Sequence, residues 1–435
     1  MFIRVSLLLV AALLITGCTH ANRALDDNHI PRQARALNNT RAALAAAEKP
    51  DADGCFVGLA LSGGGSRSAV FSAACMFELQ RLGLLERVDY ISSVSGGSLP
   101  AAYYCVSGEE WNPADVERRM SHAFATDVIL QFTLPWNFIT VLATNWDRSD
   151  LLAGSFRKTL FTRGGRELTY ADLRNDRPRL LINATDLQSG EPFIFCDENF
   201  DKLNSDLSSY PLSYAVAASA AVPVLMNHVT LRDYSTTFKQ YRHLIDGGVN
   251  DNLGIAALVE TYAAQMSAAS AAGEPTPYPN GAVFIVVDAR TRFDARLSDK
   301  GDMGMIQTLQ MGAGLTSTAL VNRASSATLA ELIVRHSRDT EEAQTLREKI
   351  AQLETHGHVE LHDRHDRPIR VVHLALSHLQ DLKDLPFRSF HQSVNSIATY
   401  FNIAPSEAHN LIKAAQLLVE QKYEPQLLRL RHELQ

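Results

Sequence analysis

The segment between residues 55 and 83 constrains the fold most, because strand, turn and helix signals follow one another without a gap. Residues 55–61 form an apolar run typical of a buried strand, and Gly63-Gly64-Gly65 follow it. Residues 68–82 then carry a helical apolar pattern, which Gly83 can end. A strand joined to a helix by a short turn is the repeating unit of α/β proteins, so the segment indicates that class.

The rest of the chain repeats this alternation. Helical patterns cover residues 212–219 and 254–272, and strand-like runs cover residues 88–94, 178–186, 243–246 and 282–288. We therefore predict an α/β fold with a mostly parallel central sheet flanked by helices. The part after residue 300 is richer in helix, although one apolar run, residues 369–376, could rejoin the sheet.

Composition limits the classes of partner. The chain has 435 residues, of which 46% are hydrophobic, enough for one large domain or two. Its formal net charge of −7 gives no support to nucleic-acid binding, which needs a basic surface. The same charge does not attract anionic lipid, so attachment to a membrane would need another device.

The N-terminus supplies such a device. Arg4 precedes an apolar run over residues 5–15 that is too short to span a bilayer and has the length of a signal-peptide core. The run leads into Leu14-Ile15-Thr16-Gly17-Cys18, which resembles the bacterial lipobox, in which the cysteine is lipidated. The alternative is an ordinary signal peptide with an incidental cysteine.

Lipidation of Cys18 would follow removal of residues 1–17 and would anchor the mature chain in a bacterial cell envelope. Thr19 stands where the lipoprotein sorting rule looks for Asp, which predicts the outer membrane. Residues 18–53 are polar with few large apolar side chains and are predicted to form a tether. We expect a main domain over residues 54–300 and a mostly helical part over residues 301–435 packed on its core.

The sequence indicates no metal site. The remaining cysteines show no metal-ligand spacing: Cys55, Cys75, Cys105 and Cys196. Of these, Cys75 and Cys105 lie in apolar helical surroundings that are typical of buried thiols. Four histidines and three acids lie close together, but their spacing matches no metal motif and suits a solvated loop: His356, His358, His362, His365, Glu360, Asp363 and Asp366.

Ser95 is the first candidate for chemistry. It lies in Ser93-Val94-Ser95-Gly96-Gly97, after the predicted strand over residues 88–94 and before a helical segment that begins near Leu99. Strand, sharp turn and helix are the context of a nucleophile elbow, which exposes the serine oxygen at a helix N-terminus. The helix dipole and free N–H groups there favour negative charge on that oxygen.

The loop Gly63-Gly64-Gly65-Ser66-Arg67 lies at the equivalent point of the preceding strand. Three glycines let backbone N–H groups converge on one spot, as required to hold a phosphate or an oxyanion. A dinucleotide site would need glycine or alanine where Ser68 stands, and a P-loop would need a Gly-Lys-Ser/Thr sequence, which this loop lacks. An oxyanion hole and a purely structural tight turn are the interpretations that remain.

An acidic residue follows the predicted strand at residues 243–246. Asp246-Gly247-Gly248 allows a sharp turn, so that Asp246 can project from the strand end. Asp251 is its nearest competitor, although a carboxylate at that position could instead cap the helix that starts near Gly254.

Taken together, these motifs resemble the patatin-like phospholipases, which combine a Gly-Gly-Gly-x-Arg loop, a Gly-x-Ser-x-Gly elbow and an Asp-Gly-Gly/Ala strand end in this order. Two intermediate stretches, residues 183–186 and 218–223, also look like family segments, so the resemblance covers about residues 56–288. One difference is that Ser93 stands where the family usually has glycine.

The resemblance implies a three-layer catalytic domain over residues 54–300 that hydrolyses carboxylic esters of membrane lipids without a metal or other cofactor. It implies that Ser95 attacks the ester and that Asp246 accepts its proton. It also implies that backbone N–H groups of Gly63, Gly64 and Gly65 hold the oxyanion, and that Arg67 steadies either this loop or the oxyanion.

Two other interpretations stay open. A Ser-His-Asp esterase would need a histidine after the acid, and His373, His378 or His391 could serve. A non-catalytic envelope lipoprotein could use the same fold to bind lipid. The aromatic segment with Trp136, Phe138 and Trp146 could contact lipid or belong to the core.

Overall fold

Five parallel strands form the centre of the fold. The computed structural model describes residues 20–25, 53–133, 147–291 and 343–435, except 224, 364 and 388. These strands are neighbours in the order β11 (Pro368–Ala375), β9 (Ala282–Asp288), β1 (Phe56–Leu61), β2 (Tyr90–Val94) and β5 (Arg179–Asp186). Their nearly continuous apolar sequences suit parallel strands, which are buried on both faces.

Antiparallel strands extend this block at both edges. On one side β10 (His358–His362) pairs with β11. On the other side β8 (Gln240–Asp246) pairs with β5, β7 (Val229–Asp233) pairs with β8, and β6 (Pro192–Phe195) also pairs with β5. The predicted α/β sheet is confirmed, but parallel pairing is confined to its centre. β6 has only four residues, and β7 and β10 contain polar residues between their apolar ones, so these strands lack the longer apolar runs by which the others were predicted.

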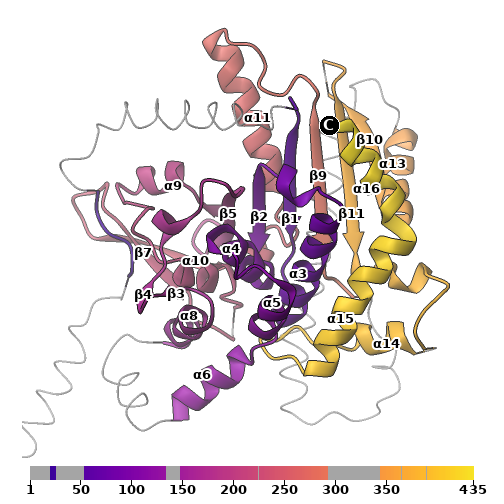
Figure 1. The fold of residues 1–435 in the computed structure, drawn as a ribbon. Helices are drawn as coiled ribbons and strands as arrows, with labels where there is room; N and C mark the ends of the chain where they lie inside the picture. Colours follow the sequence, from indigo (N-terminus) through magenta and orange to yellow (C-terminus); the bar gives the residue numbers. More distant parts are fainter. Residues whose placement is uncertain are drawn as a thin grey trace, which may run out of the picture.

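Helices cover both faces of the sheet (Figure 1). One face carries α3 (Gly65–Arg81), α4 (Ser98–Val106), α10 (Leu212–Ser219) and α15 (Pro405–Leu418). The other face carries α11 (Ile255–Ala272) and α13 (Ala343–His356). Alternate residues of β1 enter the two apolar cores, Val57 and Leu59 on the first side and Phe56 and Ala60 on the second. This alternation produces the three layers.

Further helices surround the first face and the ends of the sheet. They are α5 (Pro113–Met120), α6 (Phe124–Thr133), α8 (Arg148–Thr159), α9 (Asp197–Lys202), α14 (Phe390–Asn395) and α16 (Glu424–Glu433). A small hairpin joins β3 (Thr162–Arg163) to β4 (Arg166–Glu167). None of the described helices is long and apolar enough to cross a membrane.

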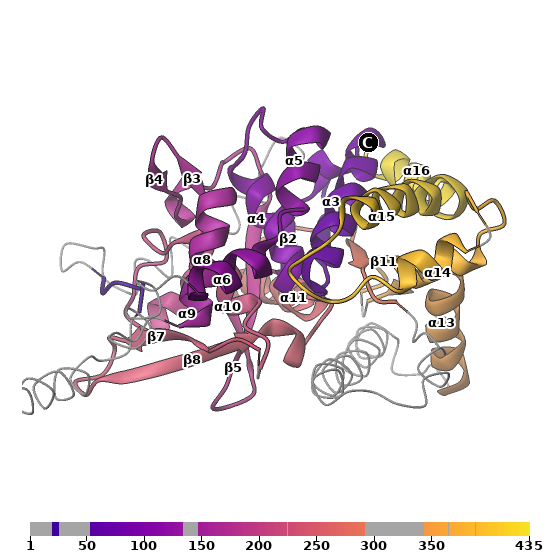
Figure 2. The same cartoon turned by 90° about the horizontal axis from the view of Figure 1, so that it is seen from below.

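Both chain ends contribute to this body. The run predicted over residues 369–376 does rejoin the sheet, as β11, and α15 packs along α3 (Figure 2). Residues on both sides of the predicted boundary at residue 300 therefore share one sheet. Residues 20–25, which fall within the predicted tether, pack beside β7 (Figure 1).

Several predicted features fall outside the described residues: the signal peptide, Cys18, Trp136, Phe138 and Trp146. Trp111 is buried and stacks on Phe77, which is a core-packing role. Cys75 and Cys105 are buried free thiols, as predicted.

Candidate active site

Ser95 lies directly after β2, at the start of a single helical turn that leads into α4. Its φ angle is +49°, in the left-handed region that non-glycine residues rarely adopt. The side chain of Ser219 accepts a hydrogen bond from the Ser95 N–H at 2.8 Å and donates one to the carbonyl of Asn183 at 2.6 Å. This network, which ties the turn to α10 and β5, offsets the strain of the left-handed backbone.

The elbow packs directly on the glycine loop. A Cβ atom at Gly96 would lie 2.0 Å from the carbonyl oxygen of Gly65, and one at Gly97 would lie 2.6 Å from that of Ser62. Only glycine allows the two backbones to come this close. The loop and Ser95 are thereby held side by side.

Asp246 lies at the end of β8 and is 7% exposed. Its carboxylate accepts a hydrogen bond from the Gly248 N–H at 2.7 Å, and the Ser95 hydroxyl lies beside it. Burial raises the pKa of Asp246 to about 6, although the Gly248 N–H and the Ser95 hydroxyl act in the opposite direction. The structure therefore places Ser95 next to a carboxylate that is more basic than an ordinary aspartate.

Asp251, the competing acid, has a structural role. Its carboxylate accepts hydrogen bonds from the N–H groups of Leu253, at 3.0 Å, and Ala256, at 2.9 Å. These contacts satisfy N–H groups at the start of α11 and match the capping alternative for this residue.

The three glycines of the loop have different partners. The Gly63 N–H donates to the carbonyl of Asn252 at 2.9 Å, so it is already occupied. Within the described part of the chain, the N–H groups of Gly64 and Gly65 have no partner. Their φ angles of +144° and +59° require glycine. Gly64 and Gly65 are therefore the better candidates for donors to an oxyanion.

Arg67 is buried beside the loop and faces the C-terminal part of the chain. Its Nη1 atom donates to the carbonyl of Ile397 at 2.9 Å and contacts the Thr291 hydroxyl at 3.5 Å. Burial lowers the pKa of Arg67 to about 10, against the influence of Asp288. Through these contacts, Arg67 holds Ile397 near the loop.

The histidines of the triad interpretation are engaged elsewhere. His373 shares a hydrogen bond with Asp288 at 3.0 Å, and the His378 ring bonds to the hydroxyl of Tyr423. His391 lies half-buried on α14. Within the described residues, none of these three histidines forms a hydrogen bond with Ser95.

Three contacts in the site were not predicted. Ser219 fixes the elbow, Asn252 fixes Gly63, and the carbonyl of Tyr400 accepts the Ser66 N–H at 2.7 Å. Ser219 lies in a small-residue segment that the sequence singled out without assigning a role. No sequence signal marks Tyr400, which lies more than 300 positions from the loop it contacts.

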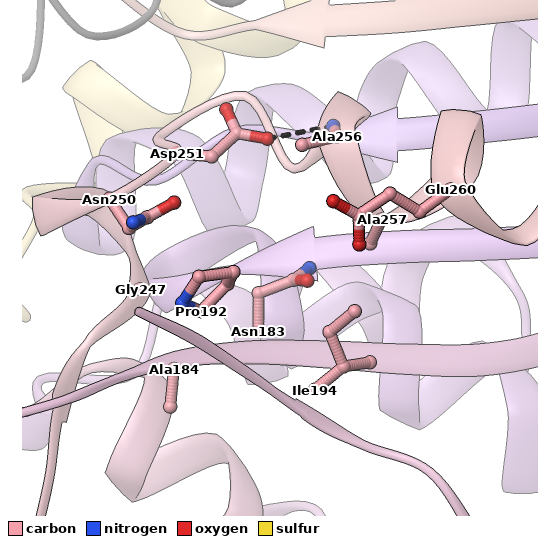
Figure 3. Close-up of a pocket in the computed structure, with 10 residues that line it drawn as sticks. All are labelled: Asn183, Ala184, Pro192, Ile194, Gly247, Asn250, Asp251, Ala256, Ala257 and Glu260. Atoms are coloured by element: carbon pink, nitrogen blue, oxygen red, sulfur yellow. Dashed lines mark hydrogen bonds between the residues drawn. The ribbon is translucent and has the colours of Figure 1, made fainter. Parts of the chain in front are cut away.

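One pocket of the described structure adjoins the loop after Asp246 (Figure 3). It lies between β5, β6, the turn after β8 and the start of α11, and its lining includes Gly247, Asn250, Asp251 and Glu260. Neither Ser95 nor Asp246 lines it, so we assign it no part in the reaction. Within the ranges described, no group of His, Cys, Asp and Glu residues could hold a metal ion.

Comparisons with known proteins concern the family and the fold. Residues 59–259 match the family model described as patatin-like phospholipase. The structure resembles human GIVD cytosolic phospholipase A2, with a TM-score of 0.50 and 13% identity over 96% of this chain and 67% of the other. No curated protein matches the sequence.

Two further structures are similar at lower scores. The same human phospholipase in complex with the inhibitor methyl gamma-linolenyl fluorophosphonate and terbium chloride has a TM-score of 0.47 and 12% identity, over 96% of this chain and 67% of the other. VipD from Legionella pneumophila has a TM-score of 0.30 and 12% identity, over 85% of this chain and 67% of the other.

Proposed function

Residues 59–259 form a patatin-like phospholipase domain, and from this premise we propose that the protein is a serine hydrolase that cleaves carboxylic ester bonds of membrane lipids. The observation that supports the proposal is the position of the Ser95 hydroxyl, at a left-handed elbow, beside the buried carboxylate of Asp246. A nucleophile next to a base and to free backbone donors is the arrangement that acyl transfer needs.

The reaction would proceed in two halves. Ser95 Oγ attacks the ester carbonyl carbon while Asp246 takes the hydroxyl proton, and the negative oxygen is held by the N–H groups of Gly64 and Gly65. Collapse expels the alcohol, which takes the proton from Asp246 and leaves an acyl group on Ser95. Water then attacks this acyl group and loses a proton to Asp246. The bond to Ser95 Oγ breaks, Oγ takes the proton from Asp246, and the fatty acid is released with both residues restored.

Within this proposal Gly63 and Arg67 act indirectly. Gly63 holds the loop to the carbonyl of Asn252, and Arg67 holds residue 397 beside the loop. This division modifies the expectation that all three glycines contact the oxyanion, and of the two roles expected for Arg67 it adopts the one that steadies the loop.

The test is labelling by a fluorophosphonate probe combined with hydrolysis of a soluble short-chain ester. Ser95→Ala should lose both labelling and hydrolysis, and Asp246→Asn should lower hydrolysis by about 10²–10⁴-fold because the general base is gone. Asp251→Asn is the control, because this carboxylate caps α11 and should keep most of the activity. Full activity of Asp246→Asn would refute the dyad, and absence of wild-type labelling would favour a lipid-binding protein.

We further propose that Cys18 is lipidated after removal of residues 1–17 and anchors the enzyme in the bacterial outer membrane. The lipobox-like sequence and the neighbouring Thr19 support this proposal. Mass spectrometry of the mature N-terminus would show the acyl groups, and Cys18→Ala should release the protein from the membrane fraction.

A further inference from the structure

The segment formed by residues 20–25, here called the docked segment, is held on the domain by a buried amide. Asn22 is 2% exposed, and its Nδ2 atom donates to the Ser205 hydroxyl at 3.0 Å and to the Arg232 carbonyl at 2.8 Å. Its Oδ1 atom accepts the N–H of Arg232 at 2.9 Å. A buried amide with three matched partners specifies one position for the segment.

Backbone contacts extend the attachment on both sides of Asn22. The carbonyl of Arg23 accepts hydrogen bonds from the Ser205 hydroxyl at 2.7 Å and the Asp206 N–H at 3.1 Å. The carbonyl of Asn22 accepts the hydroxyl of Tyr234 at 3.0 Å, and the His20 ring packs edge-on against Tyr234 and Tyr241. The docked segment therefore starts on the hairpin formed by β7 and β8 (Figure 1).

This attachment leaves little freedom for an anchor at Cys18. Cys18 and His20 are two positions apart, so an extended chain separates their Cα atoms by at most roughly 7 Å. Acyl chains on Cys18 would thus enter the bilayer next to the hairpin, rather than at the end of a long tether.

We propose that the docked segment fixes the orientation of the anchored enzyme, with the tip of the β7–β8 hairpin, residues 234–241, in contact with the lipid bilayer. This inference rests on the lipidation of Cys18 proposed above. It adds a membrane contact that belongs to the chain's own surface and is distinct from the catalytic residues.

The hairpin tip has the chemistry of a bilayer contact. Phe238 is 79% exposed, the highest value among the large hydrophobic residues of the described ranges. Lys239 follows it, and residues 234–241 contain no acidic side chain. An aromatic ring beside a lysine suits the bilayer interface, where the ring meets the acyl boundary and the ammonium group meets headgroup phosphates.

The hairpin also points toward the correct edge of the sheet. β8 runs antiparallel to β5, and Leu244 pairs with Asp186 at the carboxyl end of that strand. The earlier residues of β8 and the tip therefore lie beyond the carboxyl ends of the parallel strands, and the hairpin projects from the body (Figure 2). Ser95 follows the carboxyl end of β2, so a bilayer at the tip lies on the same edge as the candidate active site.

The first experiment measures contact directly and needs no activity. In the lipidated protein with Cys196→Ser, a polarity-sensitive fluorophore is attached to Phe238→Cys or, as the control, to Leu428→Cys. Leu428 is 38% exposed on α16, far from β7 and β8 (Figure 1). On vesicles of phosphatidylethanolamine and phosphatidylglycerol, we expect a blue shift for position 238 alone, and Asn22→Ala should reduce it. Equal shifts at both positions, or no shift at 238, would overturn the inference.

The second experiment separates orientation from chemistry. We expect Phe238→Glu to lower hydrolysis of vesicle phospholipid by about threefold to tenfold and to leave hydrolysis of a soluble ester unchanged, because only the membrane contact is altered. Leu428→Glu should leave both rates unchanged. If the wild-type protein hydrolyses neither substrate, the proposed function is contradicted, while the fluorescence experiment still tests the orientation. Unchanged vesicle hydrolysis by Phe238→Glu would contradict the orientation.

Discussion

At the scale of single residues, Asp246 combines two opposed requirements. It must be ionised to accept the Ser95 proton, yet burial disfavours its ionised form and raises its pKa to about 6. The same burial makes the carboxylate a stronger base than an exposed aspartate. Burial of Asp246 therefore lowers the stability of the fold and raises the basicity of its carboxylate.

The activity should follow the ionisation of Asp246. Because the base must be deprotonated, kcat/KM on a soluble ester should be constant above pH 7 and fall about tenfold per pH unit well below the pKa of about 6. The residual kcat/KM of the Asp246→Asn variant should not fall in this way as the pH is lowered. A wild-type midpoint near that of a solvent-exposed aspartate would contradict the burial argument.

Stability should change in the opposite sense. The folded pKa of Asp246 lies above its unfolded value, so stability is retained below the unfolded pKa and is lost as pH rises toward about 6. Asp246→Asn should therefore raise the free energy of unfolding by about 1–3 kcal/mol at pH 8. Urea unfolding measures this, and a gain that persists unchanged at pH 4 would point to another cause.

The backbone strain at Ser95 can be measured with two inactive variants. Ser95→Ala keeps a Cβ atom at φ +49°, whereas Ser95→Gly removes it. We expect the glycine variant to unfold with a free energy about 1 kcal/mol higher, because a left-handed backbone costs a non-glycine residue about that much. Urea unfolding of both variants at one pH is the measurement. A more stable alanine variant would show that the elbow is unstrained.

At the scale of elements, the site depends on two strand–turn–helix units packed backbone to backbone. The turn after β2 meets the loop after β1 at Gly96 and Gly65. Parallel neighbours place their carboxyl ends together, so both turns reach the same edge of the sheet. The donors at Gly64 and Gly65 thus come to lie beside Ser95 through strand pairing and close glycine contact.

Gly96→Ala tests that contact. Its new Cβ atom would lie 2.0 Å from backbone oxygen, so the two turns must separate. We expect loss of fluorophosphonate labelling and at least about 2 kcal/mol lower stability. Gly154→Ala is the matched control, because that glycine of α8 has nothing within 4 Å and alanine favours helix. Wild-type labelling by Gly96→Ala would show that the spacing is not required.

At the scale of the whole molecule, the C-terminal part completes the site. β11 pairs with β9 along its length, and the carbonyls of Ile397 and Tyr400 accept hydrogen bonds from Arg67 and Ser66. These residues lie beyond the segment that matches the family model. The candidate active site is therefore built from both halves of the chain.

A chain that ends at residue 291 should not fold. It would leave the edge of β9 unpaired and uncover apolar surface under α15, which promotes aggregation. Gel filtration and circular dichroism of residues 54–291 would check this. A monomer with cooperative unfolding would instead show that residues 54–291 form an independent unit.

Much of the fold could be predicted because its signals are local. The apolar runs of β1, β2, β5 and β9, the glycine turns and the elbow at Ser95 all depend on neighbouring residues. Edge strands such as β7 and β10 could not be recognised in this way. Each has five residues and only two apolar side chains, so its sequence resembles a loop until a partner strand is present.

The sequence alone determined the strand–turn–helix units and the candidates Ser95, Asp246 and Asp251, because backbone geometry at a turn is set by a few adjacent residues. Only the tertiary structure decided which acid lies beside Ser95, which loop N–H groups are occupied, and that residues 20–25 lie on the hairpin. Those contacts join residues far apart in the chain. They form because a buried polar group must find a partner within the protein, and the packing of the whole molecule determines which partners lie within reach.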